Sequence, residues 1–172
     1  MKVAIFFGSA SDTPVMKKAS AVLKEFGIEY EAFILSAHRS GELLGKTVAQ
    51  MEASGAEVII AGAGLAAALP GVIASMTVLP VIGVPLECMS ADSKGRSSNG
   101  LGGLDALLSI VQMPPRIPVA TVGINGAANA AYLAVEMLAL KYPELKEKLQ
   151  AFRAKLIEEA EQGIKDGVLK DF

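Results

Sequence analysis

The chain has 172 residues, of which 52% are apolar and 20% are charged, with 17 Gly, 8 Pro and no Trp. This composition predicts one compact domain and excludes disorder and collagen-like repeats. Sixteen basic against eighteen acidic side chains give a net charge of -2, and no basic stripe is interleaved with aromatic residues, which argues against a nucleic-acid partner. No apolar run approaches the ~20 residues of a membrane span, and the single cysteine, Cys88, cannot form an internal disulfide. We therefore expect no membrane association and a reducing, cytoplasmic setting.

Five short apolar runs, bounded by Gly, Ser or Pro, predict buried strands. They are Val3–Phe7, Tyr30–Leu35, Val58–Ala61, Val78–Val84 and Pro118–Ile124. Helical patterns alternate with them, at Pro14–Phe26, Glu42–Ser54, Gly71–Met76, Leu104–Val111 and Ala127–Leu140. This alternation predicts an α/β fold in which helices cover both faces of a parallel sheet and ligands bind at the carboxyl ends of the strands.

One segment interrupts the alternation. Residues 87–103 are rich in Ser, Gly, Lys and Arg, and they predict a long mobile loop. Such a loop is either a lid or a tolerated insertion.

A charged helix with one apolar face follows Tyr142. Its apolar residues are Leu145, Leu149, Phe152, Leu156 and Ile164. The alternating domain is already complete at Leu140, so we predict a single domain over 1–142 and a tail over 143–172 that packs on a neighbouring subunit. Packing of the tail on its own domain is the alternative.

The turn Gly8-Ser9-Ala10-Ser11-Asp12 lies where the first strand leads into a helix. Backbone amides, the helix dipole and two serine hydroxyls make it a candidate phosphate site. It is neither a Walker motif nor a full Gly-x-Gly-x-x-Gly fingerprint. Taken alone, the turn is better explained by simple helix capping through Asp12.

The sequence Ser36-Ala37-His38-Arg39 ends the second strand and contains the only histidine of the chain. A near-neutral pKa makes a histidine at a strand end a candidate for proton transfer, and Arg39 beside it can hold a phosphate or carboxylate. A single histidine is otherwise more often structural.

Small residues end the third strand, from Ala61 to Gly71. They allow a ligand to approach the backbone closely, although tight packing between helix and strand requires glycine equally. One His, one Cys and no carboxylate cluster at ligand spacing argue against a metal site. No Gly-x-Ser-x-Gly elbow supports a serine hydrolase.

These three strand-end loops, GSASD, SAHRS and AGAGLAAALPG, together resemble the PurE family of purine biosynthesis, the N5-carboxyaminoimidazole ribonucleotide mutases. Further similar stretches are LPVIGVP at 79–85, GLDALLSIVQMP at 103–114, IPVATVGI at 117–124, the segment from Asn129 and the tail YPELKEKLQAFR. The resemblance implies a three-layer α/β sandwich with a flavodoxin-like parallel five-stranded sheet. It also implies assembly as a homo-octamer.

The resemblance assigns roles to matching positions. His38 matches the catalytic histidine of the family. The substrate-binding positions are Ser9, Ser11, Asp12, Ser36, Ala37, Arg39, Gly64 and Leu69. Among them the serines and Arg39 are expected at the ribonucleotide phosphate, Asp12 at the ribose hydroxyls, and the Gly64 loop at the imidazole and its carboxylate.

The implied reaction moves a carboxylate from the exocyclic nitrogen of the substrate to ring carbon 4, through decarboxylation and recapture of carbon dioxide. It needs no metal, cofactor or ATP. One histidine suffices to carry the proton. Two alternatives stay open: a carboxylase that takes carbon dioxide and aminoimidazole ribonucleotide directly, and a weakly active or non-catalytic ribonucleotide-binding paralogue.

The third loop departs from the family pattern Gly-Gly-Ala-Ala-His-Leu-Pro-Gly. Leu65 stands at the second Gly and Ala68 at the His, and the loop 87–103 is longer than usual. We expect these changes to weaken turnover, and restoring Gly and His together to raise it, unless Lys94 or Arg96 of the long loop reaches over the site and compensates.

Overall fold

The computed structural model describes residues 1–92 and 95–165, with the backbone alone at 89–99 and 165. Its centre is a parallel five-stranded sheet of order β2-β1-β3-β4-β7. The strands are β1 (Lys2–Phe7), β2 (Glu29–Ile34), β3 (Val58–Gly64), β4 (Val81–Leu86) and β7 (Ala120–Thr121). Because β1 pairs with both β2 and β3, the carboxyl ends of these strands meet at one edge of the sheet. The predicted α/β fold and its flavodoxin-like strand order are confirmed.

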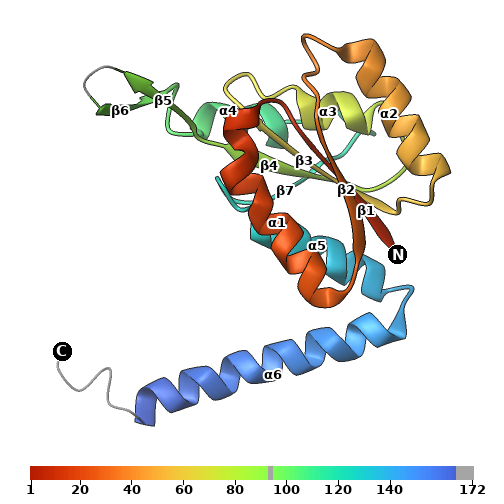
Figure 1. Cartoon of the computed structure of the whole chain (residues 1–172), viewed down its shortest axis with the longest axis vertical. Coiled ribbons are helices and arrows are strands. Elements are labelled where there is room, and N and C mark those ends of the chain that lie inside the picture. The colour runs from red at the N-terminus through yellow and green to blue at the C-terminus, as the bar shows by residue number, and fades with distance from the viewer. Residues whose placement is uncertain (93–94, 166–172) are drawn as a thin grey trace.

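Helices form a layer on each face of the sheet (Figure 1). One layer contains α1 (Thr13–Phe26) and α5 (Ala127–Ala139). The other contains α2 (Gly41–Ala53), α3 (Leu69–Ala74) and α4 (Leu104–Val111). A 3-10 turn, η1 (Ala10–Asp12), precedes α1, and a long helix, α6 (Pro143–Lys165), follows α5.

Strand β1 shows why the sheet is central. Val3, Ile5 and Phe7 point into the core beneath α1 and α5, whereas Ala4 and Phe6 point into the core beneath α2, α3 and α4. Side chains alternate across a strand, so an unbroken apolar run is buried on both faces. The two cores hold the strand ends at fixed positions.

Two strands are shorter than the sequence predicted. The fourth was expected from Val78, but β4 begins at Val81 and the Val78 side chain is 92% exposed. The last strand, expected over Pro118–Ile124, is reduced to the two residues of β7. Proline lacks the N–H that a ladder requires, so Pro80 and Pro118 each delay the start of a strand.

The segment 87–103, predicted as a long mobile loop, contains a hairpin that the sequence did not signal. Strands β5 (Cys88–Asp92) and β6 (Gly95–Asn99) pair antiparallel, with Asp92 opposite Gly95. The hairpin projects from the body of the molecule (Figure 1). The segment lacks the β-branched residues that signal strands, yet backbone pairing satisfies its N–H and C=O groups. Lys94 lies outside the described residues, as does the side chain of Arg96.

The first half of α6 packs on its own domain, which corrects the prediction that these residues cover a neighbouring subunit. Leu145 is fully buried and Leu149 nearly so, in the core with α1 and α5. Phe152 stacks on Tyr132 of α5, with ring centroids 5.1 Å apart. Without this helix, apolar side chains on the outer side of α1 and α5 would be exposed to water. The core of the domain therefore extends beyond the expected boundary at residue 142.

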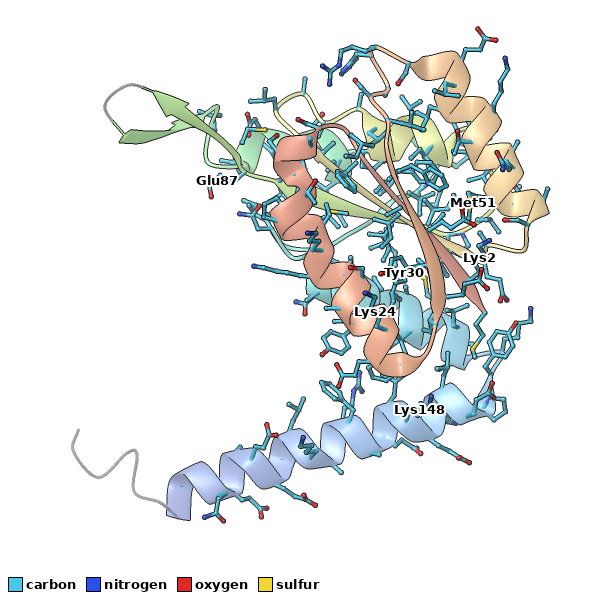
Figure 2. The ribbon with its side chains drawn as sticks, viewed as in Figure 1. Lys2, Lys24, Tyr30, Met51, Glu87 and Lys148 are labelled. Carbon is cyan, nitrogen blue, oxygen red and sulfur yellow. The ribbon has the colours of Figure 1, made fainter. Side chains whose placement is uncertain are left out.

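Polar contacts at two points fix the direction of α6. Glu57, just before β3, accepts hydrogen bonds from Lys141 Nζ at 2.6 Å and Tyr142 Oη at 2.8 Å. Lys148, which faces the end of α1 (Figure 2), donates from Nζ to the carbonyl oxygen of Phe26 at 3.1 Å. A lysine at a helix carboxyl end satisfies a carbonyl that has no partner within the helix.

The outer half of α6 runs beyond the body (Figure 1). Leu156, Ile157 and Ile164 on it are exposed. Packing of this half on a second copy of the chain remains a prediction.

Candidate functional site

The carboxyl ends of β1, β2, β3 and β4 surround a cavity of about 430 Å³. Neighbouring parallel strands bring the loops that follow them to one edge of the sheet, as expected from the fold. All nine residues singled out from the sequence line this cavity: Ser9, Ser11, Asp12, Ser36, Ala37, His38, Arg39, Gly64 and Leu69. Segments up to 60 positions apart in the chain therefore form one candidate site.

The first loop is shaped by a capping box. The Ser9 N–H donates to Asp12 Oδ2 at 3.1 Å, and Ser9 Oγ accepts from the Ser11 N–H at 3.4 Å. The Ser11 hydroxyl also donates to Ser9 Oγ at 2.8 Å. Asp12 thus takes part in capping η1, at the wall of the cavity, but it makes no side-chain cap hydrogen bond at the start of α1. The capping and ligand-binding interpretations of this turn are compatible.

Burial and hydrogen bonding have opposite effects on the pKa of Asp12. Burial raises the pKa of its carboxyl group above the usual value, while the Ser9 N–H and the Ser11 hydroxyl partly offset that rise. The side chain is a buried acceptor beside two serine hydroxyls. A ligand hydroxyl can replace solvent as a hydrogen-bond donor to it.

Ser40, which is not among the predicted site residues, closes the second loop. Ser40 Oγ donates to the Ser36 carbonyl oxygen at 2.9 Å and accepts from the Ser36 N–H at 3.1 Å. This bridge turns the chain so that His38 and Arg39 are both exposed in the loop and line the cavity. The available signal was a hydroxyl residue directly after Arg39 at the start of a helix.

The third loop needs glycine at two positions for close packing. A β-carbon on Gly62 would contact the Met16 sulfur and lie 3.1 Å from Leu86 Cδ1. A β-carbon on Gly64 would collide with Cys88 Sγ and lie 2.9 Å from the Leu86 carbonyl oxygen. The glycines bring β3 close to α1 and β4, which supports the packing explanation of this small-residue run alongside the ligand-binding one.

The fourth wall of the cavity, at the end of β4, was missed by the sequence analysis. Glu87 and Cys88 line the cavity there. Glu87 lies at the base of the hairpin (Figure 2), and Cys88 is the first residue of β5. The Glu87 N–H donates to Asn125 Oδ1 at 3.0 Å, which holds this strand end in place. Burial raises the pKa of the Cys88 thiol, and the charges of Asp12 and Asp105 raise it further. The thiol is therefore neutral at pH 7.

A second hollow, of about 610 Å³, lies between α5 and α6. It is larger than the strand-end cavity but contains none of the predicted site residues. Its lining is Glu136, Ala139, Leu140, Pro143, Lys146, Leu149, Gln150 and Arg153. Of these two cavities, the strand-end cavity is the one that combines several loops with a histidine.

A cluster of metal ligands or a membrane-spanning helix would indicate other kinds of function. Within residues 1–92 and 95–165, no group of three or more His, Cys, Asp or Glu side chains has the arrangement of a metal site. In that same part of the chain, none of the helices is both long and apolar enough to span a membrane.

The fold and the cavity define an open parallel α/β protein whose candidate ligand site lies at the carboxyl edge of the sheet. Residues 2–159 match the family model described as AIR carboxylase, so the chain belongs to that family, the PurE family. The resemblance found from the three loops is confirmed.

Similar proteins extend along most of the chain. The N5-carboxyaminoimidazole ribonucleotide mutase of Pyrococcus abyssi is 57% identical over 152 residues, 88% of this chain and 82% of the relative. The mutase of the same name from Saccharolobus solfataricus is 52% identical over 151 residues, 88% of this chain and 89% of the relative. A crystal structure of Treponema denticola PurE, 28% identical, has a TM-score of 0.80 and covers 98% of both chains.

Proposed function

We propose that this protein is a mutase of purine biosynthesis that converts N5-carboxyaminoimidazole ribonucleotide to 4-carboxyaminoimidazole ribonucleotide. The observation that carries the proposal is the convergence of all nine predicted residues on one cavity, in a chain whose relatives carry the name of this mutase. A soluble cytoplasmic enzyme that works as a homo-octamer, without metal or cofactor, is part of the same proposal.

The phosphate of the substrate is placed at the first and second loops. Ser9 and Ser11 supply hydroxyl donors beside the start of a helix, where the helix dipole favours an anion. Ser36 and Arg39 approach from the second loop, and a guanidinium binds phosphate through several N–H donors at once. Asp12, at the end of the first loop, accepts from the ribose hydroxyls.

His38 carries the proton in the reaction. The bond between the exocyclic nitrogen and the carboxylate breaks, and that nitrogen accepts a proton from the imidazolium as carbon dioxide is released. Carbon 4 of the electron-rich ring then attacks carbon dioxide, and neutral His38 removes the proton from carbon 4. His38 gives one proton to the nitrogen and takes one from carbon 4, so the reaction consumes no oxidant, reductant or ATP. One histidine near the ring therefore suffices.

Direct carboxylation is the second candidate. The matching family model is described as AIR carboxylase, which favours a reaction of aminoimidazole ribonucleotide with carbon dioxide. The same cavity and histidine serve that reaction, since its last step is the same proton removal from carbon 4. The two reactions differ only in whether carbon dioxide comes from the substrate or from solution.

The test supplies each ribonucleotide separately, with and without bicarbonate, and follows the formation of 4-carboxyaminoimidazole ribonucleotide. A mutase forms product from N5-carboxyaminoimidazole ribonucleotide without bicarbonate. Product only from aminoimidazole ribonucleotide with bicarbonate shows the carboxylase. Binding of either ribonucleotide without product shows a non-catalytic paralogue. The last two results contradict the proposal.

A further inference from the structure

Leu65, in the loop after β3, has a backbone conformation that disfavours its own side chain. Its φ is 55°, in the left-handed region that glycine accepts and larger residues avoid. In the described part of the chain, Arg116 and Asn125 are the other non-glycine residues with positive φ, and neither lines the cavity. A leucine held in this conformation at the cavity wall points to a role for its side chain.

Neighbours on two sides hold Leu65 in place. Its N–H faces the Cys88 sulfur, and its carbonyl oxygen accepts from the Ala67 N–H at 2.8 Å. Its Cδ2 lies against Gly100, directly after β6, where an added β-carbon would be 3.1 Å from that methyl group. The side chain therefore connects the loop after β3 to the base of the hairpin.

The Leu65 side chain is 45% exposed although it lines the cavity. The residues beside it, Ala66, Ala67 and Ala68, have side chains too short to cover a ligand. An apolar side chain fixed at the edge of a binding cavity becomes buried when a ligand enters, and it displaces water from the part of the ligand that it covers.

We propose that Leu65 is a positioning residue that covers the reacting carboxylate of the substrate and keeps water away while carbon dioxide is free. This inference rests on the proposed mutase function. The carbon–nitrogen bond breaks before the carbon–carbon bond forms, so carbon dioxide is released inside the cavity. If it escapes, aminoimidazole ribonucleotide is left behind with a proton on its nitrogen. An apolar cover that excludes water favours recapture.

The contacts of Leu65 reverse one expectation from the sequence. Leucine in place of the family's glycine was expected to weaken turnover. The position of its side chain beside Gly100 instead favours a supporting role for Leu65 between this loop and the hairpin. We now expect Leu65→Gly to impair the reaction.

The experiment measures leakage, defined as aminoimidazole ribonucleotide released per product formed from N5-carboxyaminoimidazole ribonucleotide. Spontaneous decarboxylation without protein is subtracted. Leu65→Gly is compatible with the positive φ but removes the apolar side chain. Leu65→Asn is compatible with the same backbone conformation but places a polar group at the site. Leu65→Met keeps an apolar side chain of similar length. We expect the Gly and Asn variants to leak at least about fivefold more, with a lower kcat and a KM within about twofold of the parent's. Leu65→Met is expected to resemble the parent.

Leu43→Asn is the matched control, because Leu43 is an exposed leucine on α2 outside the cavity. It should leak no more than the parent. If Leu65→Asn does not fold, Leu65→Gly decides the question alone, since glycine removes the backbone strain. Parent-like leakage and kcat in Leu65→Gly would overturn the inference and leave the mutase function standing. A parent that forms no product would overturn the proposed function, and this inference with it.

Discussion

Arg39 Nη2 donates a hydrogen bond to the carbonyl oxygen of Gly8 at 3.1 Å, and this contact joins the loop after β2 to the loop after β1. The two residues are 31 positions apart in the sequence, but the parallel pairing of β1 and β2 brings their loops together. A guanidinium has five N–H donors, so one can fix its position while others bind an anion. Arg39 is thus held in place before the substrate arrives.

Arg39→Lys tests this arrangement. Lysine keeps the charge but loses the fork that reaches both Gly8 and a phosphate. We expect KM for the ribonucleotide to rise about tenfold with kcat within about threefold, because the lost contacts act on the phosphate and not on the ring. Arg116→Lys, outside the cavity, is the control. Unchanged KM in Arg39→Lys would place the phosphate elsewhere.

Glu57→Gln tests the polar contacts that anchor the start of α6. Burial alone would raise the pKa of the Glu57 carboxyl group, but hydrogen bonds from Lys141 and Tyr142, and the charges of Lys141 and the N-terminal amino group, lower it below its usual 4.5. We expect the substitution to cost about 1 to 2 kcal/mol of unfolding free energy at pH 7. Glu159→Gln, which removes an exposed pair with Lys155, should cost less than about 0.5 kcal/mol.

The Glu57 effect has a defined pH dependence. A lowered pKa in the folded state means that the carboxylate stabilises the fold above its unfolded pKa, and that this stabilisation is lost as pH falls through the folded pKa. Denaturant unfolding from pH 7 down to pH 3 should show the parent and Glu57→Gln converging at the acid end. A constant difference across that range would show that the carboxylate charge is not the cause.

Leu145→Ala and Leu156→Ala form a matched pair on α6. Leu145 is 0% exposed and Leu156 is 48% exposed. Replacing a fully buried leucine with alanine lowers the free energy of unfolding by about 2 to 5 kcal/mol. Replacing an exposed leucine changes it by less than about 0.5 kcal/mol in the monomer. Thermal unfolding of both variants gives the comparison. Equal losses would mean that the two halves of the helix are equally buried in solution, as in an assembly.

Truncation after Ala154 tests the predicted assembly without removing core residues. Truncation after Tyr142 would expose the core, because Leu145 and Leu149 lie in it. The shorter chain keeps Phe152 and loses Leu156, Ile157 and Ile164. If the outer half of α6 contacts a second copy, light scattering should show a smaller oligomer with unchanged circular dichroism. If the truncated protein has the same oligomer size as the parent, the contacts between subunits lie on other surfaces.

The sequence predicted most of the framework because its signals are local. Buried parallel strands are continuous apolar runs, as in Val3–Phe7, and the loops that follow them carry the unusual residues. The hairpin was not predicted because its segment lacks the β-branched residues that signal strands. Packing of α6 on its own domain was only the alternative, because it depends on contacts between segments far apart in the chain. Within the site, Cys88 and Ser40 were not assigned a role from the sequence. Cys88 packs against Gly64, a residue that only the folded chain brings near it. Ser40 bonds to Ser36 four positions earlier, so its role depends on the local geometry of the turn.

His38→Asn tests the central claim most directly, when conversion of N5-carboxyaminoimidazole ribonucleotide and binding of the same ribonucleotide are measured on one preparation. Asparagine keeps a polar side chain of similar size but has no group that gains and loses a proton near pH 7. We predict that turnover falls at least about a hundredfold, while the circular dichroism spectrum and the Kd stay within about twofold of the parent's. A variant that turns over like the parent would contradict proton transfer by His38, and a variant that unfolds would make His38 structural.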